Sequence, residues 1–173
     1  MSRTASHPAA NAGAPTWPAA RPMTVADLDA VLAIENRAYG FPWTRGNFID
    51  SLAAGHWTAL RFDDAGALVA YAVAMPAVDE MHLLNLTVAP ASEGRGHAQA
   101  LLDRLEDHAR AMGQRSLWLE VRPSNDRARR LYTWRGFQEV GLRRGYYPAS
   151  LGRREDAIVM SLSLNPEPGD ALD

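Results

Sequence analysis

Hydrophobic side chains recur at helical spacing in four segments of the chain. The first segment runs from about residue 25 to 39, and a second, shorter segment starts near Thr44. A third follows a glycine-containing loop and ends at Gly113, a residue type that commonly follows a helix C-terminus. The fourth lies within "SNDRARRLYTWRGF", where Ser124 or Asn125 can cap its start. The pattern therefore predicts four helices.

Six other segments carry the residue types and the spacing of β-strands. In chain order they are "TALRF", "ALVAYAVAM", "EMHLLNLTVA", "RSLWLEVR", "QEVGLRRGYYP" and "DAIVMSLSL". The turn "DDAG" joins the first two as a hairpin, whereas predicted helices separate the third strand from the fourth and the fourth from the fifth. Hairpins and strand–helix–strand connections in one chain predict an α+β fold, with a mixed, mostly antiparallel central sheet flanked by helices.

The length of 173 residues fits a single domain with a substantial core. Residues 1–22 are rich in alanine and proline and lack hydrophobic periodicity, so we expect a disordered tail there. The folded domain is expected at 23–164 and a flexible C-terminal tail at 165–173. No apolar run approaches the roughly 18 residues of a membrane span, and the N-terminal tail lacks the apolar segment of a secretory signal. We therefore expect a cytoplasmic protein.

Composition excludes several chemistries. The chain contains no cysteine, so disulfides, thiolate metal sites and cysteine nucleophiles are ruled out. No spacing of histidines and acids matches a zinc protease and no serine lies in a Gly-x-Ser-x-Gly elbow, so we expect neither a metal nor serine-hydrolase chemistry. All 18 cationic residues are arginines, whose planar forks suit an anionic ligand. The net charge of -2 leads us to expect no binding to nucleic acid or membranes.

The stretch "VAPASEGRGHAQALL" joins a predicted strand to the third predicted helix through two glycines. A glycine turn that opens a helix exposes backbone N–H groups at the positive end of the helix dipole, which suits a phosphate. A structural turn that needs positive φ explains Gly94 and Gly96 equally well. Neither the Rossmann nor the Walker A spacing is present. The carboxylate of Glu93 would repel a diphosphate unless it points outward, pairs with Arg95 or is offset by another neighbouring arginine.

Residues 93–98 resemble motif A of the GCN5-related N-acetyltransferase (GNAT) family, Gln/Arg-x-x-Gly-x-Gly/Ala, with an acid at the first position. The blocks "MTVADLDAVLAIENRAYGFPWT", "NLTVAP", "LWLEVRPSNDRARRLYTWRGF" and "RRGYYPASLGRREDAIVMSLSL" are similar to the RimI-type members of this family. The similarity covers about residues 23–164, although "SLGRREDA" is one residue longer than the corresponding segment. The resemblance implies a GNAT fold, acetyl-CoA as cosubstrate, and acetylation of the N-terminal alanine of a small-subunit ribosomal protein.

The resemblance also implies which residues bind the cosubstrate. In this family the loop amides bind the pyrophosphate of acetyl-CoA, the preceding strand bonds the pantetheine arm, and an asparagine at a helix start bonds the pantetheine as well. The strand residue Val88 is also expected to polarise the thioester carbonyl. The corresponding residues here are Leu86, Thr87, Val88, Gly94, Arg95, Gly96, His97, Ala98, Gln99 and Asn125.

Acetyl transfer to an amine requires a base for the ammonium and an acid for the departing thiolate. The resemblance implies that Glu120 is the base, but from the pattern alone it could equally be a surface residue paired with Arg122. The resemblance implies that Tyr132 is the acid, although a tyrosine on an amphipathic helix more often belongs to the core. Glu80 and His82 form a competing base site on the third predicted strand.

The resemblance places the peptide substrate between the "YGFPWT" loop and the "RRGYYPASLGRRED" hairpin. Aromatic side chains would form its walls, and an acid, Glu35 or Asp156, would hold basic side chains of the ribosomal protein. The predicted substrate residues are Glu35, Tyr39, Phe41, Trp43, Tyr146 and Tyr147. Two alternatives stay open: an acetyltransferase for lysine or small-molecule amines, and an acyl-CoA-binding protein without catalysis.

Overall fold

The computed structural model describes residues 20–165 of the chain. The helices are α1 (Leu28–Ala38), α2 (Arg45–Ala53), α3 (His97–Ala111) and α4 (Asp126–Trp134). The strands are β1 (Trp57–Phe62), β2 (Leu68–Ala77), β3 (Glu80–Val88), β4 (Ser116–Val121), β5 (Gln138–Pro148) and β6 (Arg154–Ser163). Three short 3-10 turns lie at Val25–Asp27, Pro90–Ser92 and Ser150–Gly152. The α+β class predicted from the sequence is confirmed.

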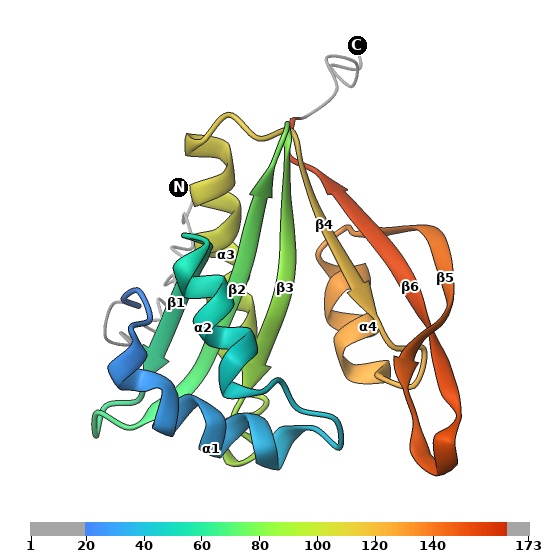
Figure 1. Cartoon of the computed structure of the whole chain (residues 1–173). Coiled ribbons are helices and arrows are strands. Elements are labelled where there is room, and N and C mark those ends of the chain that lie inside the picture. Colours follow the sequence, from blue (N-terminus) through green and yellow to red (C-terminus); the bar gives the residue numbers. More distant parts are fainter. Residues whose placement is uncertain (1–19, 166–173) are drawn as a thin grey trace, which may run out of the picture.

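The six strands form one sheet in the order β1-β2-β3-β4-β6-β5. All neighbouring strands are antiparallel except β3 and β4, which are parallel and are connected through α3. In Figure 1, α1 and α2 lie in front of the half of the sheet that contains β1 to β3, and α3 lies behind it. The sheet is therefore mixed and mostly antiparallel, as the sequence predicts.

The parallel strands β3 and β4 pair along only part of their length. Their pairing begins at Glu80 and ends at Leu83, although β3 continues to Val88. A β-bulge lies at this point, because Leu84 has no partner in β2. Since a bulge bends its strand, the ends of β3 and β4 diverge. Figure 1 shows the resulting gap between the ends of β3 and β4, which lie side by side at their starts.

Helices cover both faces of the sheet, and the side chains of β2 alternate between them. Ala70, Ala72 and Ala74 point to the face of α3 and belong to the same buried cluster as three leucines of that helix. Tyr71 and Val73 point to the opposite face, where they pack with residues of α1 and α2. The small alanines allow α3 to approach the sheet closely. None of the helices within residues 20–165 has the length and apolar character of a membrane span.

Polar side chains fix the helix starts. The N–H of Thr24 donates to the carboxylate of Asp27 at 2.8 Å, and the 3-10 turn there makes α1 begin at Leu28, later than the predicted residue 25. At the start of α4 the side chain of Asn125 accepts from the N–H of Ala128 at 3.2 Å. Of the two predicted caps of α4, Asn125 is therefore the one used.

The predicted tails lie almost entirely outside the described residues. Of the N-terminal tail the structure describes residues 20–22, and there the backbone of Arg21 exchanges two hydrogen bonds with Leu60 of β1, at 2.7 and 3.2 Å. Ala20 is buried in the core cluster beneath α3. The outer edge of β1 thus has a backbone partner along part of its length, which limits pairing with other chains.

Candidate active site

A pocket of about 490 Å³ lies between the end of β3 and the start of α4. We call it the β3–α4 pocket. Its walls come from the end of α1, the end of β3, the glycine loop, and the first turns of α3 and α4. Eight of the ten predicted cosubstrate residues line it: Leu86, Val88, Gly94, Gly96, His97, Ala98, Gln99 and Asn125. The other two, Thr87 and Arg95, do not line it.

The glycine loop has the geometry of an anion site. Gly94 and Gly96 adopt left-handed backbone conformations, with φ of 75° and 85°, which other residues take only with strain. The turn leads into α3 at His97, and the first N–H groups of this 15-residue helix have no partner within the helix. Together with the helix dipole they can hold a phosphate. The structural turn and the anion site are therefore compatible explanations for the same glycines.

The side chain of His97 belongs to the core rather than to the pocket surface. Its imidazole is buried, and Nδ1 accepts a hydrogen bond from Nε of Arg61 at 3.4 Å. Burial, followed by the charges of Arg61 and Arg95, lowers the pKa of His97 and favours the neutral ring that this bond requires. The group that His97 offers to a ligand is therefore its backbone N–H.

Glu93 pairs with an arginine that the sequence analysis does not single out. Its Oε2 lies 2.6 Å from Nη1 of Arg127, in the first turn of α4. Both residues line the β3–α4 pocket, so the ion pair connects the loop with the helix. The partner considered from the sequence, Arg95, is not part of this pair. Arg127 does leave a signal in the sequence, since a cation in the first turn of a helix opposes the helix dipole and calls for a compensating anion.

Two tyrosines, Tyr39 and Tyr132, line the pocket. Tyr132 of α4 is almost fully buried and packs edge-on against Phe137, with ring centroids 5.5 Å apart. The hydroxyl of Tyr39 donates to the carbonyl of Leu86 at 3.2 Å and bonds Oγ1 of Thr87 at 2.9 Å. Burial raises the pKa of both tyrosines, and that of Tyr132 lies well above its usual range. Both phenols are therefore protonated at neutral pH.

Glu120 lies on β4, one residue beyond the pairing with β3. Its Oε1 accepts from Nε of Arg143 at 2.8 Å, and the hydroxyl of Tyr146 also donates to the carboxylate. The alternative pairing with Arg122 does not occur, because Arg122 pairs with Glu155 at 3.3 Å. Glu120 does not line the β3–α4 pocket, and its partners come from β5. The predicted base and the predicted acid thus lie on different elements, β4 and α4.

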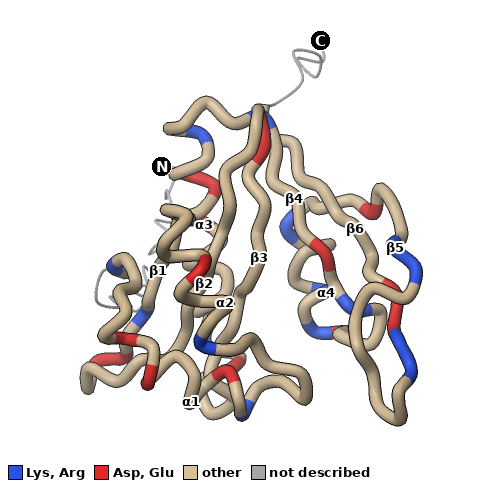
Figure 2. Tube along the Cα trace, in the orientation of Figure 1, with Lys and Arg blue, Asp and Glu red and all other residues tan. Residues whose placement is uncertain are grey.

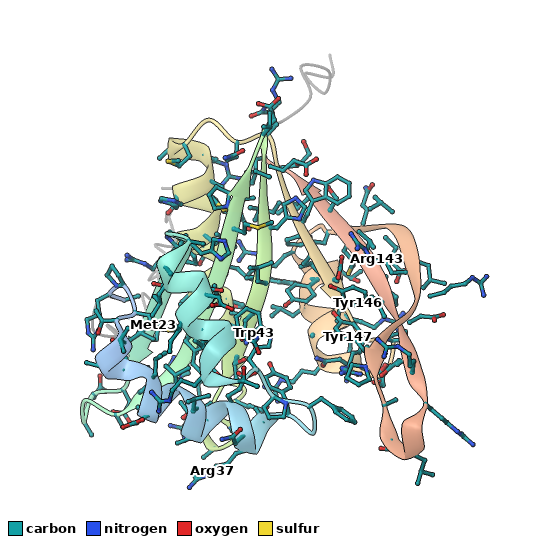
Figure 3. The ribbon with its side chains drawn as sticks, viewed as in Figure 1. Met23, Arg37, Trp43, Arg143, Tyr146 and Tyr147 are labelled. Carbon is teal, nitrogen blue, oxygen red and sulfur yellow. The ribbon has the colours of Figure 1, made fainter. Side chains whose placement is uncertain are left out.

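Arg122 connects the loop after α1 with the β5–β6 hairpin. Its guanidinium lies 4.3 Å from the ring centroid of Tyr147 and 5.8 Å from that of Phe41. Tyr146 packs edge-on against Tyr147, with centroids 4.9 Å apart. We call Phe41, Tyr146 and Tyr147 the aromatic cluster. Figure 3 shows Trp43 on one side of the gap between the ends of β3 and β4 and Tyr146 and Tyr147 on the other.

Glu35 is held inside the fold, which removes it from the predicted role of binding basic side chains. It is 1% exposed, and its carboxylate accepts from the N–H of Trp43 at 2.9 Å and from the hydroxyl of Tyr71. The amide nitrogen of Asn85 lies 3.4 Å from both of its oxygens. The Trp43 ring in turn packs against Phe48, with centroids 5.1 Å apart. Glu35 therefore fixes the loop at Trp43, and a substrate cannot reach its carboxylate.

The other predicted acid, Asp156, shapes the β5–β6 hairpin. It accepts from the N–H of Gly145 at 2.7 Å, and Arg154 donates to the carbonyl of Tyr146 at 2.7 Å. The longer segment "SLGRREDA" forms a 3-10 turn in which Leu151 adopts a φ of 59° and is 91% exposed. These bonds orient the strand that carries Tyr146.

The competing base site, Glu80 and His82, lies at the start of β3, whereas the end of this strand lines the pocket. Nε2 of His82 is 2.8 Å from Glu80, and its ring stacks on Trp118 of β4. His82 pairs with Trp118 where the two strands are still joined. Four residues of strand, roughly 13 Å, separate it from Leu86 at the pocket. His82 therefore lies on the paired part of β3, away from the end of the strand that lines the pocket.

Comparison with known proteins identifies the family. The sequence model of the acetyltransferase (GNAT) family matches residues 28–137, and these include the glycine loop, Glu120 and Tyr132. The chain belongs to the GNAT acetyltransferase family. The [ribosomal protein bS18]-alanine N-acetyltransferase of Escherichia coli (strain K12) is 39% identical over 139 residues, which are 80% of this chain and 93% of that protein.

Two further comparisons agree with this GNAT assignment. The protein of the same name from Haemophilus ducreyi is 36% identical over 138 residues, covering 80% of this chain and 94% of that one. The crystal structure of the ribosomal-protein-S18-alanine N-acetyltransferase from Escherichia coli matches with a TM-score of 0.78 and 36% identity, over 90% of this chain and 98% of that chain. The protein is therefore a GNAT N-acetyltransferase, and enzymes of this family use acetyl-CoA.

The β3–α4 pocket fits the cosubstrate of a GNAT enzyme. Its glycine loop and the start of α3 present N–H groups to an anion, and the end of β3 beyond Leu83 has no strand partner on the side of β4. An extended pantetheine arm can bond such a free strand edge as an added strand does. Within residues 20–165 no cluster of three or more His, Asp or Glu side chains could hold a metal ion.

Proposed function

We propose that this GNAT enzyme transfers acetyl from acetyl-CoA to the N-terminal alanine of ribosomal protein bS18. The observation that carries the proposal is the likeness, at 36–39% identity over 80% of the chain, to proteins named for that activity. Because the proposed substrate is a ribosomal protein, we place the reaction in the cytoplasm. Two features of the structure support the proposal. The β3–α4 pocket suits the cosubstrate, and the aromatic cluster suits a peptide.

Acetyl-CoA supplies the acetyl group as a thioester, and the β3–α4 pocket holds it. The N–H groups after Gly94 and Gly96 bind the diphosphate, and the free edge of β3 at Leu86 and Val88 bonds the pantetheine. The N–H of Val88 also polarises the thioester carbonyl. Asn125 keeps its capping bond through Oδ1, so its amide nitrogen is the group that meets the pantetheine.

Catalysis uses one base and one acid. Glu120 takes a proton from the alanine ammonium, directly or through a water. The amine nitrogen then bonds the acetyl carbon, the bond from that carbon to sulfur breaks, and Tyr132 gives its phenolic proton to the leaving sulfur. The second proton of the nitrogen leaves as the amide forms and restores the phenol of Tyr132. The position of Tyr132 in the lining of the β3–α4 pocket supports this assignment, because the pocket is the proposed site of the thioester.

The peptide terminus enters at the aromatic cluster. Arg122 holds Phe41 and Tyr147 near each other, so the two aromatic walls have a fixed spacing. Burial, with a further contribution from the charge of Glu120, raises the pKa of Tyr147 to about 12. Its hydroxyl is therefore neutral and can donate to a carbonyl of the substrate. Phe41 and Tyr146 are about half exposed, which leaves area for a peptide to cover.

Thiol release from acetyl-CoA tests the proposal. The acceptors are a hexapeptide with the alanine terminus of bS18 and the same peptide with a blocked terminus and an added lysine. Turnover on the free terminus alone is the expected result. Turnover on the blocked peptide would indicate a lysine acetyltransferase, and tight acetyl-CoA binding with no turnover on either would indicate a binding protein. Either of these outcomes overturns the proposal.

A further inference from the structure

The Glu93–Arg127 ion pair lies where a GNAT cosubstrate carries its diphosphate. Both residues line the β3–α4 pocket together with Gly94 and Gly96. An acid beside an anion site weakens anion binding unless a cation offsets its charge. Here the cation comes from α4, 34 residues away in the chain. The acid and the arginine therefore have to be considered as one unit.

The two terminal nitrogens of Arg127 have different surroundings. Nη1 bonds Glu93 at 2.6 Å, whereas Nη2 is the nearest atom to the position that a Cβ on Gly94 would occupy, at 4.0 Å. A guanidinium carries five N–H donors in a planar fork, so it can hold a carboxylate with one nitrogen and a phosphate oxygen with the other. The bond to Glu93 orients this fork with Nη2 towards the glycine loop.

The other arginines of α4 do not share this arrangement. Figure 2 shows several cationic positions along α4. Arg129 pairs with Asp126 and Glu139, and together with Arg130 it lines a separate surface hollow on the outer side of the helix. Arg127 is thus the α4 arginine that lines the β3–α4 pocket within the described chain. The positive charge of Arg127 in the first turn of α4 interacts unfavourably with the helix dipole, and the ion pair with Glu93 offsets this interaction.

We propose that Glu93 and Arg127 form a clasp in which Arg127 binds the diphosphate of acyl-CoA and Glu93 positions it. The carboxylate in the loop then serves to anchor the arginine, and Arg127 supplies a positive charge in the lining of the pocket, to which Arg95 of the loop does not contribute. The clasp rests on the proposed role of the β3–α4 pocket as the acetyl-CoA site.

Calorimetric titration of CoA into four proteins tests the clasp: the wild type, Glu93→Gln, Arg127→Gln and the double variant. We expect Arg127→Gln to weaken binding about tenfold, the lower end of what a charge-assisted hydrogen bond contributes, because the pair is half exposed. Glu93→Gln should weaken binding about threefold when Arg127 is present, since the fork loses its anchor. When Arg127 is already replaced by glutamine, Glu93→Gln should tighten CoA binding, because it removes an uncompensated negative charge beside the diphosphate.

The comparison of the two backgrounds decides the outcome. If Glu93→Gln changes the Kd by the same factor in both, the residues act independently and the clasp is wrong. Dephospho-CoA, which keeps the diphosphate but lacks the 3′-phosphate, should show the same tenfold effect of Arg127→Gln. Loss of that effect would mean that Arg127 binds the 3′-phosphate instead, and would overturn the assignment.

Controls separate the clasp from general effects. Arg130→Gln removes the same charge from the outer side of α4 and should leave the Kd unchanged. With acetylpantetheine as donor, which has no phosphate, Arg127→Gln should keep the kcat/KM of the wild type. If the wild type binds no CoA, the proposed function fails; if it binds CoA and all four Kd values agree, the clasp alone fails.

Discussion

Nε of Arg143 lies 2.8 Å from Oε1 of Glu120, although strand β6 runs between their two strands. On β6, Val159 pairs with Glu120 and Ala157 pairs with Arg143. The small alanine leaves room for the arginine to reach across the strand. The ion pair therefore ties the proposed base to the β5–β6 hairpin, the element that carries Tyr146 and Tyr147.

Replacing Glu120 by glutamine is expected to lower kcat by roughly 10²-fold, since the amide keeps the size of the side chain but cannot accept the proton. The KM for acetyl-CoA should stay close to that of the wild type, because Glu120 does not line the β3–α4 pocket. Thiol release at saturating peptide, measured over a range of acetyl-CoA concentrations, gives both constants. Glu139→Gln, an exposed acid of β5 paired with Arg129, is the matched control and should keep its kcat. An unchanged kcat in Glu120→Gln would show that another group takes the proton.

Tyr132→Phe should also lower kcat by roughly 10²-fold while the protein stays folded, because the ring keeps its packing against Phe137. Burial raises the pKa of Tyr132, so the phenol remains protonated as the pH rises to about 10, where an ordinary tyrosine loses its proton. The kcat of the wild type should therefore not fall below that pH through this group. Profiles of kcat against pH for both proteins check this. A fall that is present in the wild type and absent in the variant would contradict the raised pKa.

The helices and strands could be predicted from the sequence because they have local causes. Helical spacing, strand alternation and capping residues such as Asn125 act over a few positions, and positive φ at Gly94 and Gly96 is a property of the turn. The sequence does not distinguish the 3-10 turn before α1 from the helix itself, because both show the same hydrophobic spacing.

The partners of charged residues could not be predicted, because they depend on how distant elements meet. Glu120 pairs with Arg143 and not with Arg122, two residues away, because the strand order brings β5 next to β6. The pair of Glu93 with Arg127 likewise requires α4 to lie against the glycine loop. The burial of Glu35 could not be predicted either, because its hydrogen-bond partners Tyr71 and Asn85 lie on strands β2 and β3.

Arg122 sets the spacing of the aromatic walls through its contacts with Phe41 and Tyr147. Arg122→Met keeps a long apolar stem but loses the cation, and should raise the KM for the peptide about fivefold, in keeping with roughly 1 kcal/mol for a cation–π contact. The KM for acetyl-CoA should not change. Arg144→Met, at an exposed arginine of β5, is the control. A rise in both KM values would indicate a general loss of structure instead.

Glu35 is a buried carboxylate whose removal leaves several donors without a partner. Glu35→Ala is expected to lower the free energy of unfolding by about 3 kcal/mol, because the N–H of Trp43 and the hydroxyl of Tyr71 lose their acceptor. Urea denaturation measures the change. The exposed control Glu139→Ala should remain within about 0.5 kcal/mol of the wild type. A loss in Glu35→Ala as small as in the control would mean that water replaces the carboxylate.

Asp27 links stability to pH at the start of α1. A hydrogen bond from Arg21 is the main cause that lowers the pKa of Asp27 below its usual range. The stabilisation is therefore complete above the pKa of about 4 that the unfolded chain has, and it declines as the pH falls below that value. Asp27→Ala should lower the free energy of unfolding by about 1 kcal/mol at neutral pH, as the loss of a helix cap does.

Urea denaturation of the wild type and Asp27→Ala at pH 7 and at about pH 2 measures this dependence. The difference between the two proteins should shrink at the acid pH, because protonation weakens the bond to Arg21 in the wild type. Asp29→Ala is the matched control, since its carboxylate is 90% exposed and pairs with Arg45 at the surface. A difference that is equal at both pH values would place the stabilising effect in the hydrogen bond to the N–H of Thr24 rather than in the charge of Asp27.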